Sequence, residues 1–310
     1  MRHLLTWADY NVEEIQAILQ VAHDLKAELK SGTRSTTLQQ QVIGLLFQKP
    51  SLRTRVSFES LAAQTGAASL FLGEDVGGWG KREPANDFFP VLSSYVDCLI
   101  IRAKSHEDLL QAASLSRCPV INGLTDFSHP CQALADIMTI QELCGDLNNV
   151  KIAYIGDCNN VALSLALLAG KLGVRCSIAS PAAYQFNDVQ RQWLTTNAGN
   201  DAFLEITEDA RLAVTDADVV YTDVWTSMGQ ESETRERLEH FQSYQVNAEL
   251  MATAKETARF LHCLPARRGE EVSADIIDGP VSATIHQAEN RLHAQKGLVV
   301  WLMQQNGNTA

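Results

Sequence analysis

The chain has 310 residues, of which 45% are hydrophobic and 20% are charged, and its formal net charge is -12. This length favours two domains of about 150 residues each, and the composition is that of an ordinary globular protein. An acidic chain with no evident basic face is not expected to bind nucleic acid.

The cysteines and the apolar stretches argue against several further classes of protein, namely zinc-binding, disulfide-bonded, secreted and membrane-spanning proteins. The seven cysteines are scattered and form no Cys-x-x-Cys pair, which argues against a zinc site or a disulfide framework. The N-terminal stretch MRHLLTWADY lacks the apolar core of a signal peptide. The longest apolar run, near VALSLALLAG, is well short of the roughly 20 residues that a membrane helix needs. We therefore expect a cytoplasmic protein with reduced thiols and no membrane association.

Short apolar runs bounded by turn residues alternate with helical patterns along the whole chain. These runs predict buried strands at residues 42–47, 97–102, 119–123, 151–156, 175–180, 218–223 and 259–263. Such alternation predicts an α/β fold built on parallel sheets. The polar, turn-rich segment 144–151 is the candidate domain boundary.

The stretch FQKPSLRTRVSFE, residues 47–59, joins a predicted strand to a predicted helix that begins near Ser51. The N–H groups at a helix N-terminus favour an anion, and Arg53 can grip phosphate oxygens with two hydrogen bonds. Ser51 and Thr54 can add hydroxyl hydrogen bonds. These three residues together predict a phosphate site, whereas Arg55 is expected to pair with Glu59 at i,i+4.

A second motif, DFSHPCQALAD (residues 126–136), opens another helix. Pro130 suits the first helical position, where its missing N–H costs nothing. His129 and Gln132 then lie one turn apart and can face the same cleft. Cys131 faces another direction, which is compatible with a packing role. Arg102, at the end of a predicted strand, would by itself be taken for a surface arginine.

The stretch at residues 47–59 resembles the carbamoyl-phosphate signature of the aspartate/ornithine carbamoyltransferase superfamily, with Leu52 where that family carries threonine. The resemblance implies that His129 and Gln132 contact the carbamoyl group and that Arg102 and Arg291 contact the phosphate. It also implies two domains, each with a central parallel sheet flanked by helices, linked by two interdomain helices. The carbamoyl-phosphate site that it implies consists of Ser51, Leu52, Arg53, Thr54, Trp79, Arg102, His129, Pro130, Cys131, Gln132, Cys263, Leu264 and Arg291.

Three later motifs resemble the ornithine-specific branch of this superfamily. They are GDCNN (156–160), DVWTSMG (223–229) and HCLPARRGEEV (262–272), and AENRLHAQKGLVVWLM (288–303) resembles the closing helix of the family. The resemblance implies that Asn160, Asp223, Ser227, Met228 and Cys263 bind ornithine. By the same resemblance, the residues expected to carry the catalysis are Arg53, Arg102, His129, Asp223 and Cys263.

The implied reaction transfers a carbamoyl group from carbamoyl phosphate to ornithine, which gives citrulline and phosphate without a metal or an organic cofactor. The implied domains are residues 1–145, with helix 287–310 packing back on them, and residues 146–286. The family's trimer implies self-association with shared active sites, in which we expect Trp79 to serve the site of an adjacent chain.

Four other interpretations remain open at this stage. Leu52 and Trp79 are compatible with an N-acylornithine carbamoyltransferase, although Asp223 and the SMG sequence favour plain ornithine. Aspartate as the acceptor would set its carboxylate against Asp223. A nucleotide-dependent dehydrogenase would need the Gly-x-Gly-x-x-Gly pattern, which is missing at residues 156–160. A non-catalytic binding protein would be expected to have lost some of these residues.

Overall fold

The computed structural model describes residues 1–73, 83–199, 203–227 and 230–307. The chain forms two compact units, residues 1–135 with 291–310 and residues 136–290. The boundaries fall inside helices α5 (Pro130–Cys144) and α12 (Thr284–Gln305), so each of these helices contributes to both units, as expected. The boundaries expected from the sequence, at 145/146 and 286/287, stay a prediction.

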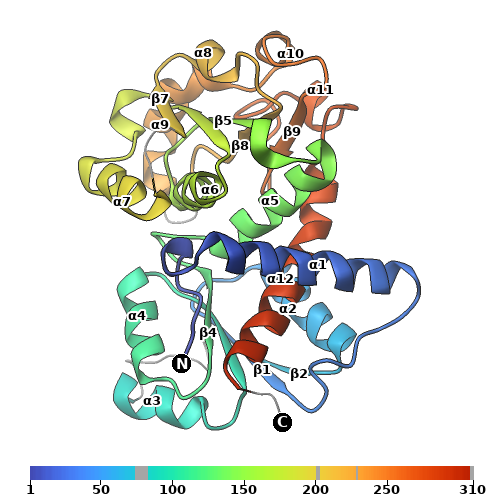
Figure 1. The fold of residues 1–310 in the computed structure, drawn as a ribbon. Coiled ribbons are helices and arrows are strands. Elements are labelled where there is room, and N and C mark those ends of the chain that lie inside the picture. Colours follow the sequence, from blue (N-terminus) through green and yellow to red (C-terminus); the bar gives the residue numbers. More distant parts are fainter. Residues whose placement is uncertain (74–82, 200–202, 228–229, 308–310) are drawn as a thin grey trace. The chain divides into compact units, whose positions relative to one another are not determined.

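The first unit is built on a parallel sheet with the strand order β2-β1-β3-β4 (Figure 1). Three of its strands, β1 (Val42–Phe47), β3 (Cys98–Arg102) and β4 (Val120–Leu124), were expected from their apolar runs. Each of them is almost wholly buried, because helices cover both faces of a parallel sheet. The edge strand β2 (Ala68–Leu72) is partly exposed.

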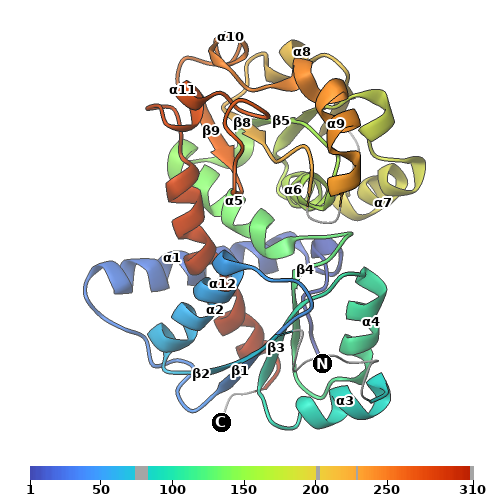
Figure 2. The same ribbon diagram turned by 180° about the vertical axis from the view of Figure 1, so that it is seen from behind.

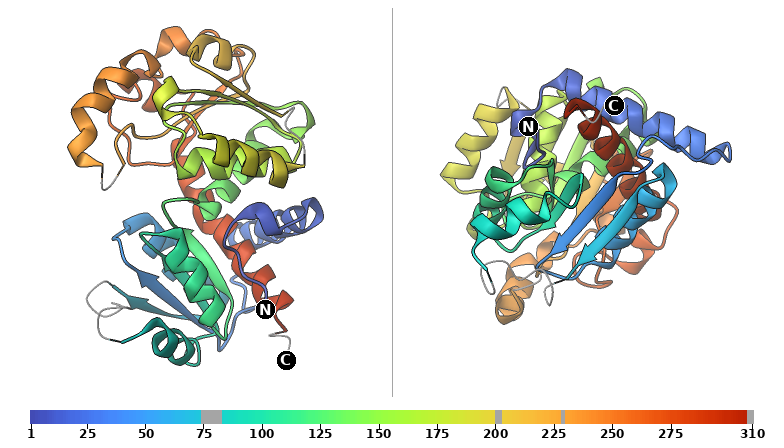
Figure 3. Two further views of the ribbon diagram at one scale, coloured as in Figure 1. Left: turned by 90° about the vertical axis from the view of Figure 1, so that its left-hand side faces the viewer. Right: turned by 90° about the horizontal axis from the view of Figure 1, so that it is seen from below.

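Helices of the first unit begin where the sequence places capping residues. Ser51 is the N-cap of α2 (Leu52–Thr65), and Gly66 closes that helix in the left-handed conformation that glycine adopts without strain. The other helices are α1 (Val12–Lys30), α3 (Ala85–Leu92) and α4 (His106–Leu115), and α3 and α4 pack side by side. The N-terminus and the C-terminal end of α12 both belong to this unit (Figure 3).

The second unit contains a five-stranded parallel sheet with the order β7-β6-β5-β8-β9. Its strands are β5 (Lys151–Ile155), β6 (Arg175–Ala179), β7 (Leu204–Thr207), β8 (Val219–Thr222) and β9 (Arg259–His262). No apolar run predicted β7, because this edge strand is short and only partly buried. Ala153, Val220 and Phe260 belong to an apolar cluster on one face, and the residues that alternate with them point to the other face.

Helix α6 (Asn160–Lys171) follows β5 and is buried over nearly its whole length. It packs beside α7 (Asp188–Ala198), as both ribbon views show (Figures 1 and 2). The remaining helices of the second unit are α8 (Ala210–Val214), α9 (Thr234–Phe241), α10 (Ala248–Met251) and α11 (Ala274–Ile277). Within the described ranges, no helix has both the length and the hydropathy to span a bilayer.

Candidate active site

The first group of site residues lies in the first unit, where β1 leads into α2. The Ser51 hydroxyl accepts the Thr54 N–H at 3.4 Å and donates to the Thr54 hydroxyl at 3.0 Å. Leu52 points outward with an exposed fraction of 76%, whereas Thr54 is buried. Arg55 forms the predicted pair with Glu59, at 2.9 Å between Nε and Oε1. The strand–loop–helix junction therefore has the form expected of an anion site.

Two further arginines of the first unit, Arg102 and Arg291, add positive charge near this junction. Arg102, at the end of β3, is buried, and its pKa is lowered to about 10 by burial and then by the charges of Arg291 and Arg53. Burial, followed by the charges of Arg291 and Arg102, lowers the pKa of His129 well below 6.5. Among the described residues, neither Arg53 nor Arg102 forms an ion pair with a carboxylate. A bound anion would relieve the mutual repulsion of these cations.

Arg291 of α12 reaches back to two residues that the sequence assigned to the same site. Its Nη1 donates to Gln132 Oε1 at 2.5 Å, and its Nη2 donates to the Thr54 hydroxyl at 3.4 Å. Cys131, by contrast, is fully buried, and its thiol donates to the Asn122 carbonyl at 3.4 Å. The thiol of Cys131 therefore has a packing contact in this unit, while Gln132 and Arg291 belong to the cationic group.

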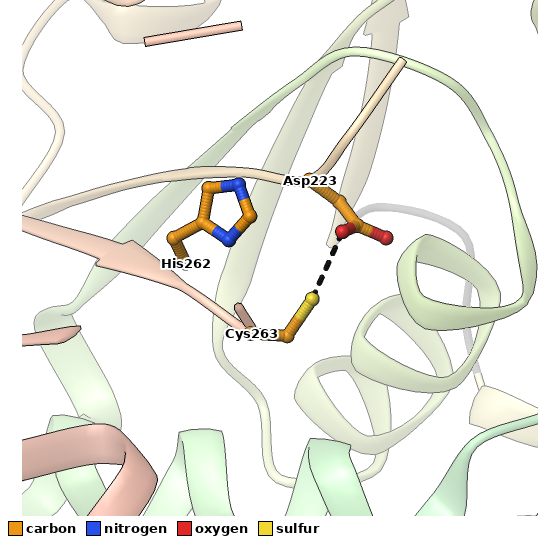
Figure 4. A group of neighbouring side chains, drawn as sticks. All are labelled: Asp223, His262 and Cys263. Atoms are coloured by element: carbon orange, nitrogen blue, oxygen red, sulfur yellow. Dashed lines mark hydrogen bonds between the residues drawn. The ribbon is translucent and has the colours of Figure 1, made fainter. Parts of the chain in front are cut away.

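The second group of site residues lies in the second unit, at the carboxyl ends of β8 and β9 (Figure 4). Asp223 follows β8, and its Oδ1 accepts a hydrogen bond from the Cys263 thiol at 3.0 Å. Asn159 caps α6 through its Oδ1 and donates from Nδ2 to the other Asp223 oxygen at 2.9 Å. This end of the sheet offers a carboxylate and a thiol, which suit an amine. In an open α/β sheet, ligands bind at this edge.

A buried histidine–glutamate pair supports the turn that carries Cys263. His262 Nδ1 accepts the Leu264 N–H at 2.8 Å, so its Nε2 carries the hydrogen and donates to Glu271 Oε1 at 3.1 Å. The same Glu271 oxygen accepts the Arg267 N–H at 2.6 Å. Leu264 has a φ of +57°, which is strained for a branched side chain. The hydrogen bond from Leu264 to the His262 imidazole helps to hold this conformation.

Asp223, His262 and Cys263 also lie close enough for one atom of each to approach a single metal ion, within 4.8 Å of one another. Both nitrogens of His262 are already engaged, with Leu264 and Glu271. His262 would have to give up one of these bonds to bind a metal, so we assign it a structural role. The prediction that the site needs no metal stays a prediction.

Arg237 of α9 connects the two loops that border Asp223. Its Nη1 donates to the Asp157 carboxylate at 2.8 Å and to the Trp225 carbonyl at 2.9 Å, and its Nε donates to Glu233 at 3.0 Å. The guanidinium also lies 4.9 Å from the centre of the Tyr184 ring. Asp157 belongs to the β5–α6 loop and Trp225 to the loop after β8, so one buried cation fixes both loops.

Within each unit, some of the residues that the sequence singled out lie in contact with one another and others do not. In the second unit, Asn160 is the first residue of α6 and is half-buried, whereas its neighbour Asn159 contacts Asp223. Ser227 is half-buried, and its N–H donates to Gln230. Trp79 and Met228 lie outside the described residues.

Five residues of the second unit that support the site were not predicted: Asp157, Asn159, Arg237, His262 and Glu271. The Asn-Asn sequence directly before a helix could have revealed Asn159 as a cap. The i,i+4 spacing could have paired Arg237 with Glu233, but no spacing rule would have found its contact with Asp157 or the contacts of Glu271.

Comparison with known proteins agrees with this arrangement. The carbamoyl-P binding domain of aspartate/ornithine carbamoyltransferases matches residues 2–142, and the Asp/Orn binding domain matches residues 148–302. Among similar proteins, ornithine carbamoyltransferase of Anoxybacillus flavithermus is 47% identical over 97% of this chain and 96% of its own length. Ornithine carbamoyltransferase of Bacillus subtilis is 49% identical, over 96% and 92% of the two chains.

The fold is shared as well. The solved structure of ornithine carbamoyltransferase from Pyrococcus furiosus has a TM-score of 0.93 and 46% identity, and the match covers 98% of this chain and 97% of the other. Two domain matches, full-length relatives and a shared fold leave one conclusion: this chain belongs to the aspartate/ornithine carbamoyltransferase family.

Proposed function

We propose that the two groups of residues carry out the reaction of an ornithine carbamoyltransferase, in which carbamoyl phosphate and L-ornithine give L-citrulline and phosphate. Relatives with this name are 46–49% identical over 96–97% of the chain, which favours ornithine over N-acylornithine as the acceptor. The observation that carries the residue roles is the cationic group of the first unit, in which Arg102 and Arg291 are buried and Arg53 is half-buried. Arg53 and Arg102 have no carboxylate partner among the described residues.

Carbamoyl phosphate binds to this cationic group. Arg53, Arg102 and Arg291, with the N–H groups at the start of α2, neutralise the phosphate and prepare it as a leaving group. His129, which its environment keeps neutral by lowering its pKa, can donate a hydrogen bond to the carbamoyl oxygen. Ser51, Thr54 and Gln132 complete the polar lining. Fixed donors of this kind act on charge that develops in the transition state without reorganising.

Ornithine binds to the second unit. Its side-chain amine has a pKa near ~10.4 by analogy with lysine, so the amine must lose a proton before it can attack. Asp223 and Cys263 hold and orient this amine, while Asn160, Ser227 and Met228 bind the amino-acid end. The amine nitrogen attacks the carbamoyl carbon, and a tetrahedral intermediate forms. The C–O bond to phosphate then breaks, and the departing phosphate takes up the amine proton. Positioning and electrostatics suffice for this chemistry.

One assay separates this proposal from its alternatives. Citrulline formation from carbamoyl phosphate should require unmodified ornithine, and N-acetylornithine, N-succinylornithine and aspartate should give little product. Preference for an N-acylated ornithine would favour the N-acylornithine enzyme, which Leu52 and Trp79 left open. Absence of carbamoyl transfer to all four amines would refute the catalytic role.

The same proposal includes a cytoplasmic homotrimer in which Trp79 completes the site of an adjacent chain. Arg53→Ala and Trp79→Ala should each be nearly inactive. Mixed, dissociated and reassembled, they should regain part of the parent activity, since some sites then combine intact Arg53 and Trp79 from different chains. Hybrids that stay inactive while reassembled parent recovers would show that Trp79 does not act across chains.

A further inference from the structure

Two tyrosines lie side by side in the sheet of the second unit, directly behind Asp223 and Cys263. Tyr154 of β5 and Tyr221 of β8 are partners in the strand register, and their rings stack with centroids 5.5 Å apart and an interplanar angle of 25°. Both side chains are fully buried. Neither hydroxyl has a hydrogen-bond partner among the described residues.

The strand register relates this pair to the amine-binding residues. Tyr154, Tyr221 and Leu261 form one row across β5, β8 and β9. Side chains two residues further along a strand point to the same face, roughly 6.6 Å away. The next row on this face therefore contains Gly156, Asp223 and Cys263, so the tyrosines lie one row below the carboxylate and the thiol.

Gly156 contributes no side chain to that second row. Its φ is +141°, which favours glycine, and a Cβ at this position would meet nothing closer than the Thr222 hydroxyl at 3.6 Å. The side chains that this second row contributes on the face of the tyrosines are therefore the Asp223 carboxylate and the Cys263 thiol.

The surroundings also fix the protonation state of both phenols. Burial first, and then the Asp223 carboxylate and Cys263, raise the pKa of Tyr154 well above 10. Burial, followed by Asp136, Cys263 and Asp223, raises the pKa of Tyr221 in the same direction. Both phenols therefore keep their hydrogen at neutral pH and can donate it as well as accept.

Burying a hydroxyl without a partner costs free energy, and a phenylalanine would fill the same space without that cost. A buried water usually makes two to four hydrogen bonds to polar groups that would otherwise be unsatisfied. We propose that Tyr154 and Tyr221 are positioning residues of the reaction, which hold a buried water that bonds to Asp223 and keeps the Asp223–Cys263 pair oriented toward the substrate amine. This inference rests on the proposed function for its kinetic consequence, but not for the water itself.

The test compares Tyr154→Phe, Tyr221→Phe and the double variant with a matched control, Tyr244→Phe. Tyr244 is also buried in the second unit, but its hydroxyl donates to the Glu208 carbonyl at 2.7 Å, away from Asp223. The double variant should lose about tenfold in kcat/KM for ornithine, the effect of one hydrogen bond to a charged group. Its KM for carbamoyl phosphate should stay near that of the parent, and Tyr244→Phe should keep the kinetics of the parent for both substrates.

A high-resolution crystal structure of the parent supplies the second measurement. It should show a water within hydrogen-bond distance of at least one tyrosine hydroxyl and of Asp223. No water there, unchanged ornithine kinetics in the double variant, or an equal loss for both substrates would each overturn the inference. A parent that does not carbamoylate ornithine would refute the proposed function instead, and the crystal structure would still decide whether the tyrosines hold a water.

Discussion

Replacing the buried Arg237 with methionine should destabilise the second unit more than replacing an exposed arginine of the same helix, α9. Methionine keeps much of the length and volume of the arginine stem but removes every donor. The variant loses the ion pair with Asp157 at 2.8 Å, the bond to the Trp225 carbonyl at 2.9 Å and the contact with the Tyr184 ring. The Arg237 side chain is only 6% exposed and that of Asp157 only 11%, so water cannot easily replace these bonds.

The expected loss follows from the burial of the partners. Removing one member of a buried ion pair costs about 3–5 kcal/mol, because the other charge is left uncompensated. The freed Trp225 carbonyl would add about 1–3 kcal/mol if it stayed unpaired, but contributions within one network overlap. Glu233, whose side chain is 53% exposed, contributes little. We therefore expect a total loss of about 3–5 kcal/mol in the free energy of unfolding.

Guanidinium denaturation followed by circular dichroism and tryptophan fluorescence measures this loss. Arg235→Met is the matched control, because Arg235 is on the same helix, is 94% exposed, and bonds Glu239 at 3.3 Å. It should unfold like the parent. Ornithine KM should rise in Arg237→Met, since both loops that border Asp223 lose their common anchor. A loss below about 1 kcal/mol for Arg237→Met would refute the reasoning that this ion pair is buried and poorly replaced by water.

The pH dependence gives an independent check on the same variant. Burial raises the pKa of Asp157 above its usual 3.8, and Arg237 opposes that shift. A carboxyl whose pKa is higher in the folded state than in the unfolded state binds more protons when the chain is folded, so it favours folding at low pH. This contribution to the free energy of unfolding is lost as the pH rises through the pKa of the folded state. Without Arg237, the pKa of Asp157 in the folded state should rise further. The deficit of Arg237→Met relative to the parent should therefore shrink as the pH is lowered, and a deficit independent of pH would contradict this account.

Three further predictions concern other residues. Arg53→Ala should lower kcat/KM by about a hundredfold, which is the value of one charge-assisted hydrogen bond in a transition state. Arg55→Ala is the control, because Arg55 pairs with Glu59, and it should keep nearly the activity of the parent. An activity of Arg53→Ala within about twofold of the parent would show that Arg53 is not part of the site. Alkylation of the Cys263 peptide should slow when carbamoyl phosphate and norvaline are present, and equal rates would place Cys263 outside the site. Burial, followed by the charge of Arg34, lowers the pKa of Lys296 from 10.5 to about 8. Between these two pH values the folded chain binds fewer protons than the unfolded chain. The free energy of unfolding should therefore rise with pH across that range. Lys296→Met should weaken this rise, as measured by denaturation midpoints at either end of the window, and an identical slope in parent and variant would count against a buried lysine.

The fold was largely accessible from the sequence because most of its strands are buried on both faces. Residues 42–47 and 151–155 read as short apolar runs, and both became central strands of parallel sheets. The edge strand β7 escaped the pattern because only one side of an edge strand is paired and its residues are partly exposed. A hydrophobic pattern in the sequence therefore predicts a strand because the strand is buried. It predicts an edge strand only where that edge strand is buried too.

The candidate site divides in the same way, between residues that we propose to contact the substrates and residues that hold those side chains in place. The first kind sits at helix starts and strand ends, where local chemistry is visible in the sequence: Ser51 caps α2, and Asp223 and Cys263 each follow a strand. The second kind depends on partners from other elements. Arg237 is 80 residues from Asp157, and nothing near either residue predicts the pair.

Such supporting residues follow a physical rule rather than a sequence pattern. A buried polar group must find a partner, and where the partner is remote the chain has to bring it in by folding. His262 directly precedes Cys263, and Asp157 lies in a loop that borders Asp223. Both are buried, and their partners are remote or lie in a loop: Arg237 for Asp157 and Glu271 for His262. A polar residue that lies near a predicted binding residue, at the end of a buried strand, is therefore expected to have a supporting hydrogen-bond partner. Only the structure can identify that partner. Tyr154 and Tyr221 extend the rule one row further into the sheet, where the partner that we infer is a water rather than a side chain.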